Sequence, residues 1–368
     1  MEQLLAPVAG LLEIVSDYWK EPLYRHAFTL LMLLYVWLWC TKSNEMATLK
    51  GLFRHISVWT DSLVYMVLSK DNKGLGVKYQ NPGSQSDPAY VAKRLDETIK
   101  KRIFFIRHGE SDWNFIFNRG KNIGMLFRLL RAIVIEWTMI FKLDSPFLDS
   151  PLFEEGIQQA LELREYIETD QKGLTEKQRS LINILRGTEG TSIVVSSTLR
   201  RAIATTTLAL WPRIKRNNEK IALLSHCSEI SRNVDTYAIS PKNTVADLPF
   251  SRVSPHCDGE QNCHAGIYNA SLNLGPKSIS VPGKSRMEEF NKWAMESQED
   301  NIIVGGHSLW FKQFFNLYLP FDSTHTAKKE KIVNSGVIAF DLYKLKGEKA
   351  YYIDPSSMEV VYGGFTKK

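Results

Sequence analysis

A short apolar run at residues 103–106 ends in a turn that carries a cation, an imidazole, a glycine and two small polar side chains. The run predicts a buried strand, and Gly109 lets the backbone just beyond it come close to a ligand. A bidentate cation, an imidazole and two neutral polar groups suit a phosphate dianion. The residues that supply these groups are Arg107, His108, Ser111 and Asn114.

Three later apolar runs, at 192–197, 221–224 and 301–306, also predict strands. Polar or charged residues follow each of them closely. If the strands are parallel, their carboxyl ends meet at one edge of a sheet, where the following side chains would form one site. The charged residues and imidazoles just beyond these three strands are Arg200, Arg201, His226, Glu229 and His307.

Residues 107–110 read Arg-His-Gly-Glu, which resembles the signature of the histidine phosphatase superfamily, also called the phosphoglycerate-mutase-like superfamily. The segments that resemble the family's later blocks, in the same order, are 149–160, 198–206, 301–308 and 333–341. Phe153 departs from the hydroxyl residue that normally caps a helix in the second block, and Ser308 replaces the usual glycine. Together the matches cover roughly residues 101–345.

The resemblance implies an α/β fold: a three-layer α/β/α sandwich with a mostly parallel central sheet, to which this chain adds an N-terminal helical region. The catalytic domain is expected over 95–368, with insertions at about 115–147 and 231–280. Residues 1–70 predict helices, and the turn-rich segment 71–94 predicts a linker. Residues 91–101 are expected to form a helix that leads into the first strand.

The resemblance also assigns roles. His108 would attack phosphorus and form a phosphohistidine, and Glu229 would protonate the leaving oxygen and later activate water. Arg107, Arg201 and a protonated His307 would stabilise the transition state. Ser111 and Asn114 would position the ester, with Arg200 beside them.

Two of these assignments have alternatives. His226 and Glu260 could replace Glu229 as the proton donor. Arg200 is expected either to contact substrate or to be a solvated helix residue.

No cofactor or metal is expected, because the cationic residues can do the work that other phosphotransfer enzymes give to magnesium. Residues 256–264 hold two histidines and two cysteines, but the spacing between Cys257 and Cys263 is wider than in most zinc sites. We therefore favour a loop there over a metal site.

The chain has 368 residues, of which 44% are hydrophobic and 23% charged, so it can bury a sizeable core. Four cysteines are too few for a disulfide framework and favour a reducing compartment. The net charge of +6 suits an anionic substrate or membrane surface, and no motif supports binding to nucleic acid.

Residues 27–41 form an uncharged run that would make a helix about 22 Å long, short of the roughly 30 Å hydrocarbon core. A buried helix, an in-plane membrane segment and a short anchor all remain open. Residues 121–142 predict a second apolar helix with basic residues on one face, which could pack on the N-terminal helices, lie on an anionic bilayer or cover the active site. Its polar positions are Lys121, Arg128, Arg131, Thr138 and Lys142. We expect a cytoplasmic protein, or one associated with a membrane on its cytosolic face.

The predicted function is a phosphomonoester hydrolase. The mutases of the family carry Glu-Arg-x-Tyr-Gly after the acidic residue, whereas residues 229–233 read Glu-Ile-Ser-Arg-Asn. A mutase and a catalytically silent phosphate-binding scaffold are the alternatives. The substrate could be a phosphorylated small molecule, lipid or protein.

Overall fold

The structure is a computed structural model that describes residues 43–76, 78, 80–120, 123–142, 144–248, 250–257 and 266–366. The chain divides into two compact units. Of the described residues, 43–56 and 140–142 belong to the first unit, in which the His55 ring bonds the Lys142 carbonyl at 3.0 Å. All the predicted site residues belong to the second unit.

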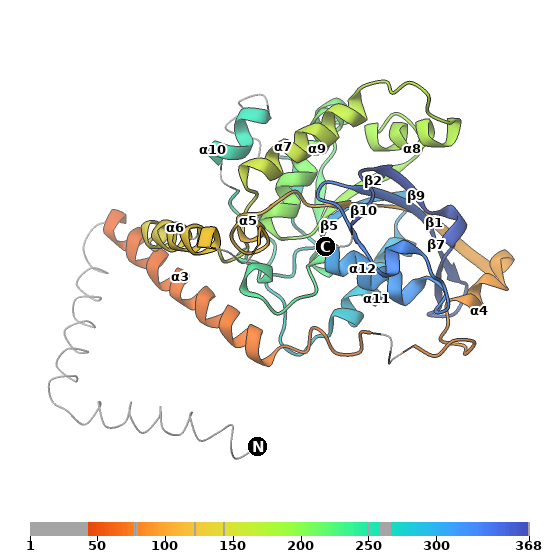
Figure 1. Ribbon diagram of the computed structural model, residues 1–368, viewed down its shortest axis with the longest axis horizontal. Coiled ribbons are helices and arrows are strands. Elements are labelled where there is room, and N and C mark those ends of the chain that lie inside the picture. The colour runs from red at the N-terminus through yellow and green to blue at the C-terminus, as the bar shows by residue number, and fades with distance from the viewer. Residues whose placement is uncertain are drawn as a thin grey trace, which may run out of the picture. The chain divides into compact units, whose positions relative to one another are not determined.

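A mixed, mostly parallel sheet forms the centre of the second unit, in the order β4-β3-β2-β5-β1-β7-β8, with β9 paired to β7 (Figure 1). The strands β1 to β5 pair parallel to one another, and β7 runs antiparallel to β1. Their bounds are β1 (Thr98–Arg107), β2 (Ser192–Ser196), β3 (Ile221–Leu223), β4 (Tyr268–Asn269), β5 (Asn301–Gly306), β7 (Val337–Leu345), β8 (Tyr351–Ile353) and β9 (Glu359–Tyr362). A separate ribbon pairs β6 (Lys331–Ile332) with β10 (Phe365–Thr366).

Helices lie on both sides of this sheet, as the sequence predicts for an α/β sandwich. One layer holds α7 (Glu154–Glu168), α8 (Glu176–Arg186) and α9 (Arg200–Asn217), and the other holds α11 (Gly283–Glu296) and α12 (Ser308–Tyr318). The remaining α-helices are α3 (Ser43–Leu68), α4 (Ala89–Ala92), α5 (Asp112–Phe117), α6 (Ile123–Met139) and α10 (Phe250–Val253). The prediction of the fold class is confirmed.

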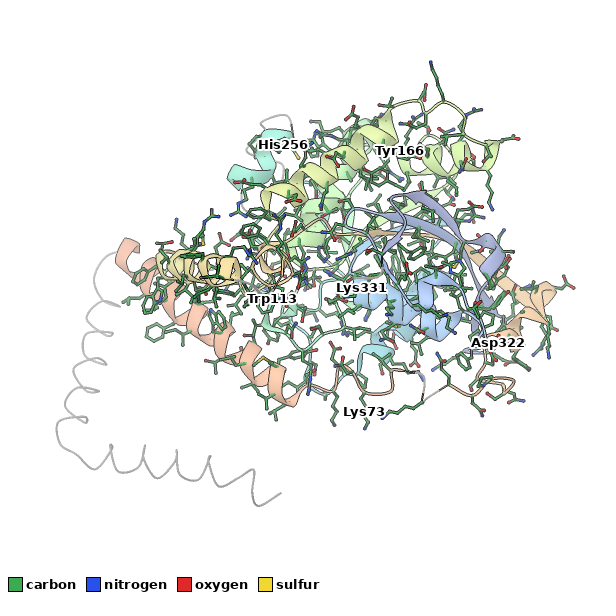
Figure 2. All side chains as sticks on the ribbon, in the orientation of Figure 1. Lys73, Trp113, Tyr166, His256, Asp322 and Lys331 are labelled. Atoms are coloured by element: carbon green, nitrogen blue, oxygen red, sulfur yellow. The ribbon has the colours of Figure 1, made fainter. Side chains whose placement is uncertain are left out.

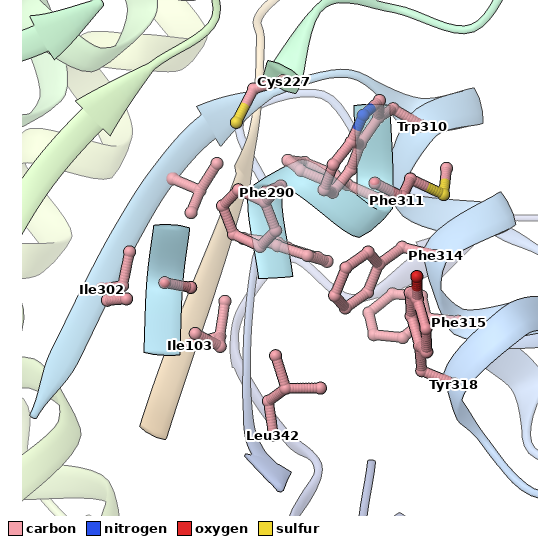
Figure 3. Packing of buried hydrophobic residues seen from close by; sticks show 14 of the residues in the cluster. Ile103, Cys227, Phe290, Ile302, Trp310, Phe311, Phe314, Phe315, Tyr318 and Leu342 are labelled. Carbon is pink, nitrogen blue, oxygen red and sulfur yellow. The ribbon is translucent and has the colours of Figure 1, made fainter. Parts of the chain in front are cut away.

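The core on the α11 and α12 side is aromatic. Phe105 of β1 is fully buried and stacks on Phe311 of α12, with ring centroids 4.1 Å apart. Full burial of one such side chain stabilises the fold by about 2 kcal/mol. The other rings of this cluster are Phe340 and four that are labelled in Figure 3, Phe290, Trp310, Phe314 and Phe315. The cluster fixes α12 against β1, and so fixes the segment between β5 and α12.

The prediction of a helix over residues 91–101 is wrong. After α4 and a single 3-10 turn, β1 already begins at Thr98, and residues 98–101 pair with β7 from Leu345 to Leu342. The backbone hydrogen bonds of this long antiparallel pairing outweigh the local helical pattern, because tertiary context overrides propensity.

The predicted run at 27–41 lies outside the described residues. Within the part of the chain that the structure describes, no helix is both long and apolar enough to cross a bilayer. The helix expected at 121–142 is present as α6, over Ile123–Met139. In the described residues of the long 231–280 segment, the elements are short, among them α10 and β4.

Candidate active site

The register of the sheet brings two histidines together. Arg107 at the end of β1 pairs with Gly306 at the end of β5, so that His108 and His307 follow side by side. The backbone N–H of His108 donates to the Gly306 carbonyl at 3.0 Å, and the two imidazole centroids lie 5.1 Å apart. Both rings are buried.

The protonation of the His108 ring follows from its neighbours. Nδ1 lies 2.6 Å from the Gly109 carbonyl, which can only accept, so Nδ1 carries the proton. Nε2 then presents its lone pair and accepts from Arg201 Nε at 3.3 Å. Burial, followed by the charges of Arg201 and Arg107, lowers the pKa of His108 well below its usual value. These surroundings favour the neutral form of the imidazole.

Two buried guanidinium groups flank this ring. Arg201, the second residue of α9, is held by the Asp235 carbonyl at 2.7 Å and its carboxylate at 3.4 Å. Arg107 donates to the Ile332 carbonyl at 2.5 Å, while its Nε has no hydrogen-bond partner. Burial lowers the pKa of Arg107 to about 10, which leaves it charged at neutral pH. The pair makes a fixed positive environment for a phosphoryl group.

His307 is the N-cap residue of α12, and its Nε2 lies 2.8 Å from Ser197 Oγ at the end of β2. Its Nδ1 is buried without a hydrogen-bond partner. Burial, then the Arg201 charge and His108, lowers the pKa of His307 well below its usual value. The protonated His307 expected from the family resemblance would therefore need the negative charge of a bound phosphate.

The Glu229 carboxylate lies at the N-terminus of the same helix. Its oxygens accept from the backbone N–H groups of Trp310 at 2.8 Å and Leu309 at 3.3 Å. Burial raises the pKa of Glu229, while the Arg201 charge and the backbone amides oppose that rise. Burial therefore makes Glu229 a weaker acid than an exposed glutamate, as a proton donor requires.

Of the two predicted alternatives to Glu229, Glu260 lies outside the described residues. The ring of His226 is half-buried, and burial lowers its pKa, an effect that the Glu289 charge opposes and the Arg286 charge adds to. The Arg201 charge acts on the pKa of Glu229 and is not among these causes for His226.

The sequence predicts that Gly109 lets the backbone approach a ligand, but in the structure Gly109 lies against the backbone of Gly156. A Cβ on Gly109 would lie 2.4 Å from the Gly156 carbonyl oxygen, and a Cβ on Gly156 would lie 2.0 Å from that of Glu110. The two glycines thus let the first turn and the start of α7 touch, backbone against backbone. The close approach is to the protein itself.

Ser111 and Asn114 form the start of α5. Ser111 is buried, and its Oγ caps the helix by accepting from the Asn114 backbone N–H at 3.3 Å. The Asn114 amide oxygen accepts from Asn118 at 2.8 Å. Both residues thus hold the turn that follows His108, and their predicted contacts with the ester remain a prediction.

The interpretation of Arg200 as a solvated helix residue is wrong, because only 1% of the residue is exposed. Its Nε donates to the Asp149 carbonyl at 2.8 Å, and its Nη1 pairs with Asp144 at 2.5 Å. Its Nη2 donates to the carbonyls of Ser145 and Leu148. These contacts turn the Arg200 guanidinium toward 144–149 and leave Arg201 as the arginine that faces His108.

A buried ion cluster behind Glu229 involves a residue that the sequence places in the linker. Asp71 is fully buried and pairs with Lys277 at 3.2 Å and with Arg286. Lys277 in turn donates to the carbonyls of Glu229 at 2.9 Å and Ser231 at 2.8 Å. Asp71 therefore ties the connector to the loop that carries Glu229.

Replacing Asp71 by asparagine is expected to leave Lys277 and Arg286 as uncompensated buried charges and to lower the free energy of unfolding by about 3 kcal/mol. Chemical denaturation measures this. Asp96→Asn, at an exposed carboxylate before β1, is the matched control and should change the stability little. Equal stabilities of the two variants would contradict the role of Asp71.

Several site residues escape sequence reasoning. Nothing marks Asp235 or Lys331, whereas Ser197 and Thr205 sit in the serine and threonine positions of the family's third block. Thr205 Oγ1 accepts from the Gly109 backbone N–H at 3.0 Å. Lys331, labelled in Figure 2, is half-buried, and burial and the Arg107 charge lower its pKa, while Glu229 raises it. Lys331 thus lies within the electrostatic reach of the site.

The structure does not test the loop at 256–264 as a metal site, because Cys263 and His264 lie outside the described residues. Cys257 is buried. A pocket of about 460 Å³ opens elsewhere, between the connector and α11, and contains none of the predicted site residues.

No family model and no curated protein matches the chain. Among solved structures, the chain is similar to a mycobacterial glucosyl-3-phosphoglycerate phosphatase, with 13% identity over 72% of this chain and 99% of that one and a TM-score of 0.34. A protein described as an alpha-ribazole-5'-P phosphatase from Escherichia coli is 14% identical over 73% and 97%, with a TM-score of 0.33. A phosphoglycerate mutase from Bacillus anthracis is 14% identical over 70% and 93%, with a TM-score of 0.34. Likenesses this distant carry no argument about function.

Proposed function

We propose that the protein is a phosphomonoester hydrolase of the histidine phosphatase type, which works without a metal ion through a phosphohistidine on His108. The observation that carries this proposal is the orientation of the buried His108 ring, with Nε2 turned toward Arg201 and Nδ1 beside the Gly109 carbonyl. The resemblance supports it, since His108, Arg201 and His307 occupy positions within the matching segments and the resemblance assigns Glu229 as the proton donor.

The reaction has two displacements. His108 Nε2 forms a bond to phosphorus as the bond to the ester oxygen breaks, and Glu229 gives its proton to that oxygen. Water then attacks phosphorus, Glu229 takes a proton from the water, and the phosphorus–nitrogen bond breaks to release phosphate. Arg107 and Arg201 stabilise the equatorial oxygens throughout. Bound phosphate would also raise the pKa of His307 and favour the protonated ring.

The two buried titratable groups predict a bell-shaped pH profile for kcat/KM. His108 must be neutral, and its pKa is lowered from 6.5, so activity should rise with pH through an acid limb below that value. Glu229 must be protonated, and its pKa is raised from 4.5, so activity should fall through an alkaline limb above that value. Rates measured from acid to alkaline pH check this. A rate that climbs steadily toward alkaline pH would contradict Glu229 as the donor.

Phosphate release from a panel of phosphomonoesters, measured with the full chain in the presence of EDTA, tests the proposal. Turnover in the chelator supports it, and the preferred ester indicates the class of substrate. Turnover that disappears with EDTA and returns with a divalent metal would contradict metal independence. No turnover with any ester would leave the mutase, tested by adding a phosphate donor, or the silent scaffold.

A further inference from the structure

Helix α6 has an outer face that is apolar along its whole length. Seven large apolar side chains are each between 39% and 75% exposed, and they recur at helical spacing on one side. They are Ile123, Leu126, Phe127, Leu130, Ile133, Val134 and Trp137, which we name the α6 outer face. Apolar surfaces this continuous are uncommon on soluble monomers and mark interaction sites.

The opposite side of α6 is anchored, so the helix cannot rotate to bury the outer face. Ala132 is buried in a cluster with Ile116 of α5 and Phe147, against which Trp113 packs. Helix α5 lies beside α6 in Figure 1, and Trp113 is labelled in Figure 2. Glu136 accepts from Trp59 Nε1 at 2.6 Å and from Ser145 Oγ at 2.6 Å. These contacts hold the apolar side of the helix toward solvent.

The charges of α6 are arranged for an anionic surface. Glu136 is the one carboxylate of the helix, and it is turned inward to Trp59 and Ser145. Arg131 and Thr138 are exposed and follow the outer face around the helix. In the sequence, Lys121 and Lys142 flank the helix, and the whole chain carries a net charge of +6. Among the described residues of α6, the outer face therefore has one exposed cation beside it, Arg131, and no acidic residue.

We propose that α6 lies in the plane of an anionic lipid bilayer, with its outer face among the acyl chains and Arg131 at the phosphate headgroups. A helix of 17 residues is about 25 Å long, enough to lie in the interface but short for crossing the bilayer. A protein partner would be expected to meet polar groups within the interface, and the outer face offers only the Trp137 indole N–H. Docking would hold the enzyme at a membrane surface and does not depend on the proposed reaction.

Flotation of the full chain with vesicles tests the proposal. The chain should bind phosphatidylcholine vesicles that contain phosphatidylserine and bind pure phosphatidylcholine more weakly. The triple variant Phe127→Gln, Val134→Gln, Trp137→Gln should lower the partition coefficient at least about tenfold. These side chains are more than 60% exposed, so the variant should fold, which an unchanged melting temperature verifies.

A matched control replaces three exposed apolar residues elsewhere, as Leu95→Gln, Leu274→Gln and Val360→Gln, and should bind like the parent chain. Residues 27–41 are the same in all three proteins, so a difference between variants reports α6. Equal binding by parent and α6 variant, equal binding to both vesicle types, or no vesicle binding would contradict the proposal. Self-association that the α6 variant abolishes, without vesicle binding, would instead identify a second copy as the partner.

Discussion

Replacing His108 by alanine should reduce the rate of phosphate release at least about 10⁴-fold, because the attacking nitrogen is lost and water alone must displace the alcohol. Stopped assays on the best ester of the panel measure this effect. Folding should survive, since the Arg201, Asp235 and His307 contacts with other residues remain.

His226→Ala is the control for this variant. It removes a half-buried histidine on the loop that precedes Glu229 and should keep most of the activity. If His108→Ala retained more than a small fraction of the parental turnover, the nucleophile would have to be sought elsewhere. If His226→Ala lost as much as His108→Ala, His226 would have to be reconsidered as the acid.

Replacing Glu229 by glutamine should slow the hydrolysis of alkyl phosphates by about 10²- to 10⁴-fold, because the poor leaving oxygen then lacks a proton donor. An ester with a good leaving group, such as p-nitrophenyl phosphate, needs little protonation and should lose much less. The alkaline limb of the pH profile should disappear as well. Steady-state kinetics with both esters measure the contrast.

The leaving-group contrast separates proton donation from a purely structural role. Glu229 also accepts hydrogen bonds from backbone N–H groups in the first turn of α12, and a glutamine side chain would keep one oxygen as an acceptor for them. If the carboxylate acts only as a helix cap, both esters should lose activity equally and the melting temperature should fall. Equal losses would therefore contradict the role of Glu229 as acid.

The sequence predicts the α/β class because the apolar runs that become β1, β2, β3 and β5 are each buried along the strand. Their ends also mark His108, Arg201, Glu229 and His307. Such local signals survive folding because a parallel sheet needs continuous apolar strands and gathers its functional residues at one edge. The catalytic roles of these residues remain predictions.

Contacts between distant parts of the chain could not be predicted. Asp71 meets Lys277 across 206 positions, and a turn-rich connector gives no sign that one carboxylate in it is buried. The orientation of α6 about its own axis also could not be predicted from the sequence. Periodicity places Arg128 and Arg131 on one face, yet Arg128 lies over the Phe115 ring and donates to the Ile116 carbonyl, whereas Arg131 is exposed. Which face turns inward depends on the neighbours.

The central claim is a covalent bond between phosphorus and His108. Phosphohistidine survives alkali, so the enzyme can be mixed with an ester labelled in its phosphate, quenched in alkaline denaturant during turnover and digested. The account predicts labelled phosphate on the peptide that contains His108, formed at least as fast as turnover and absent from His108→Ala. Turnover of the ester with no label on the protein at any time would contradict it and indicate direct attack by water.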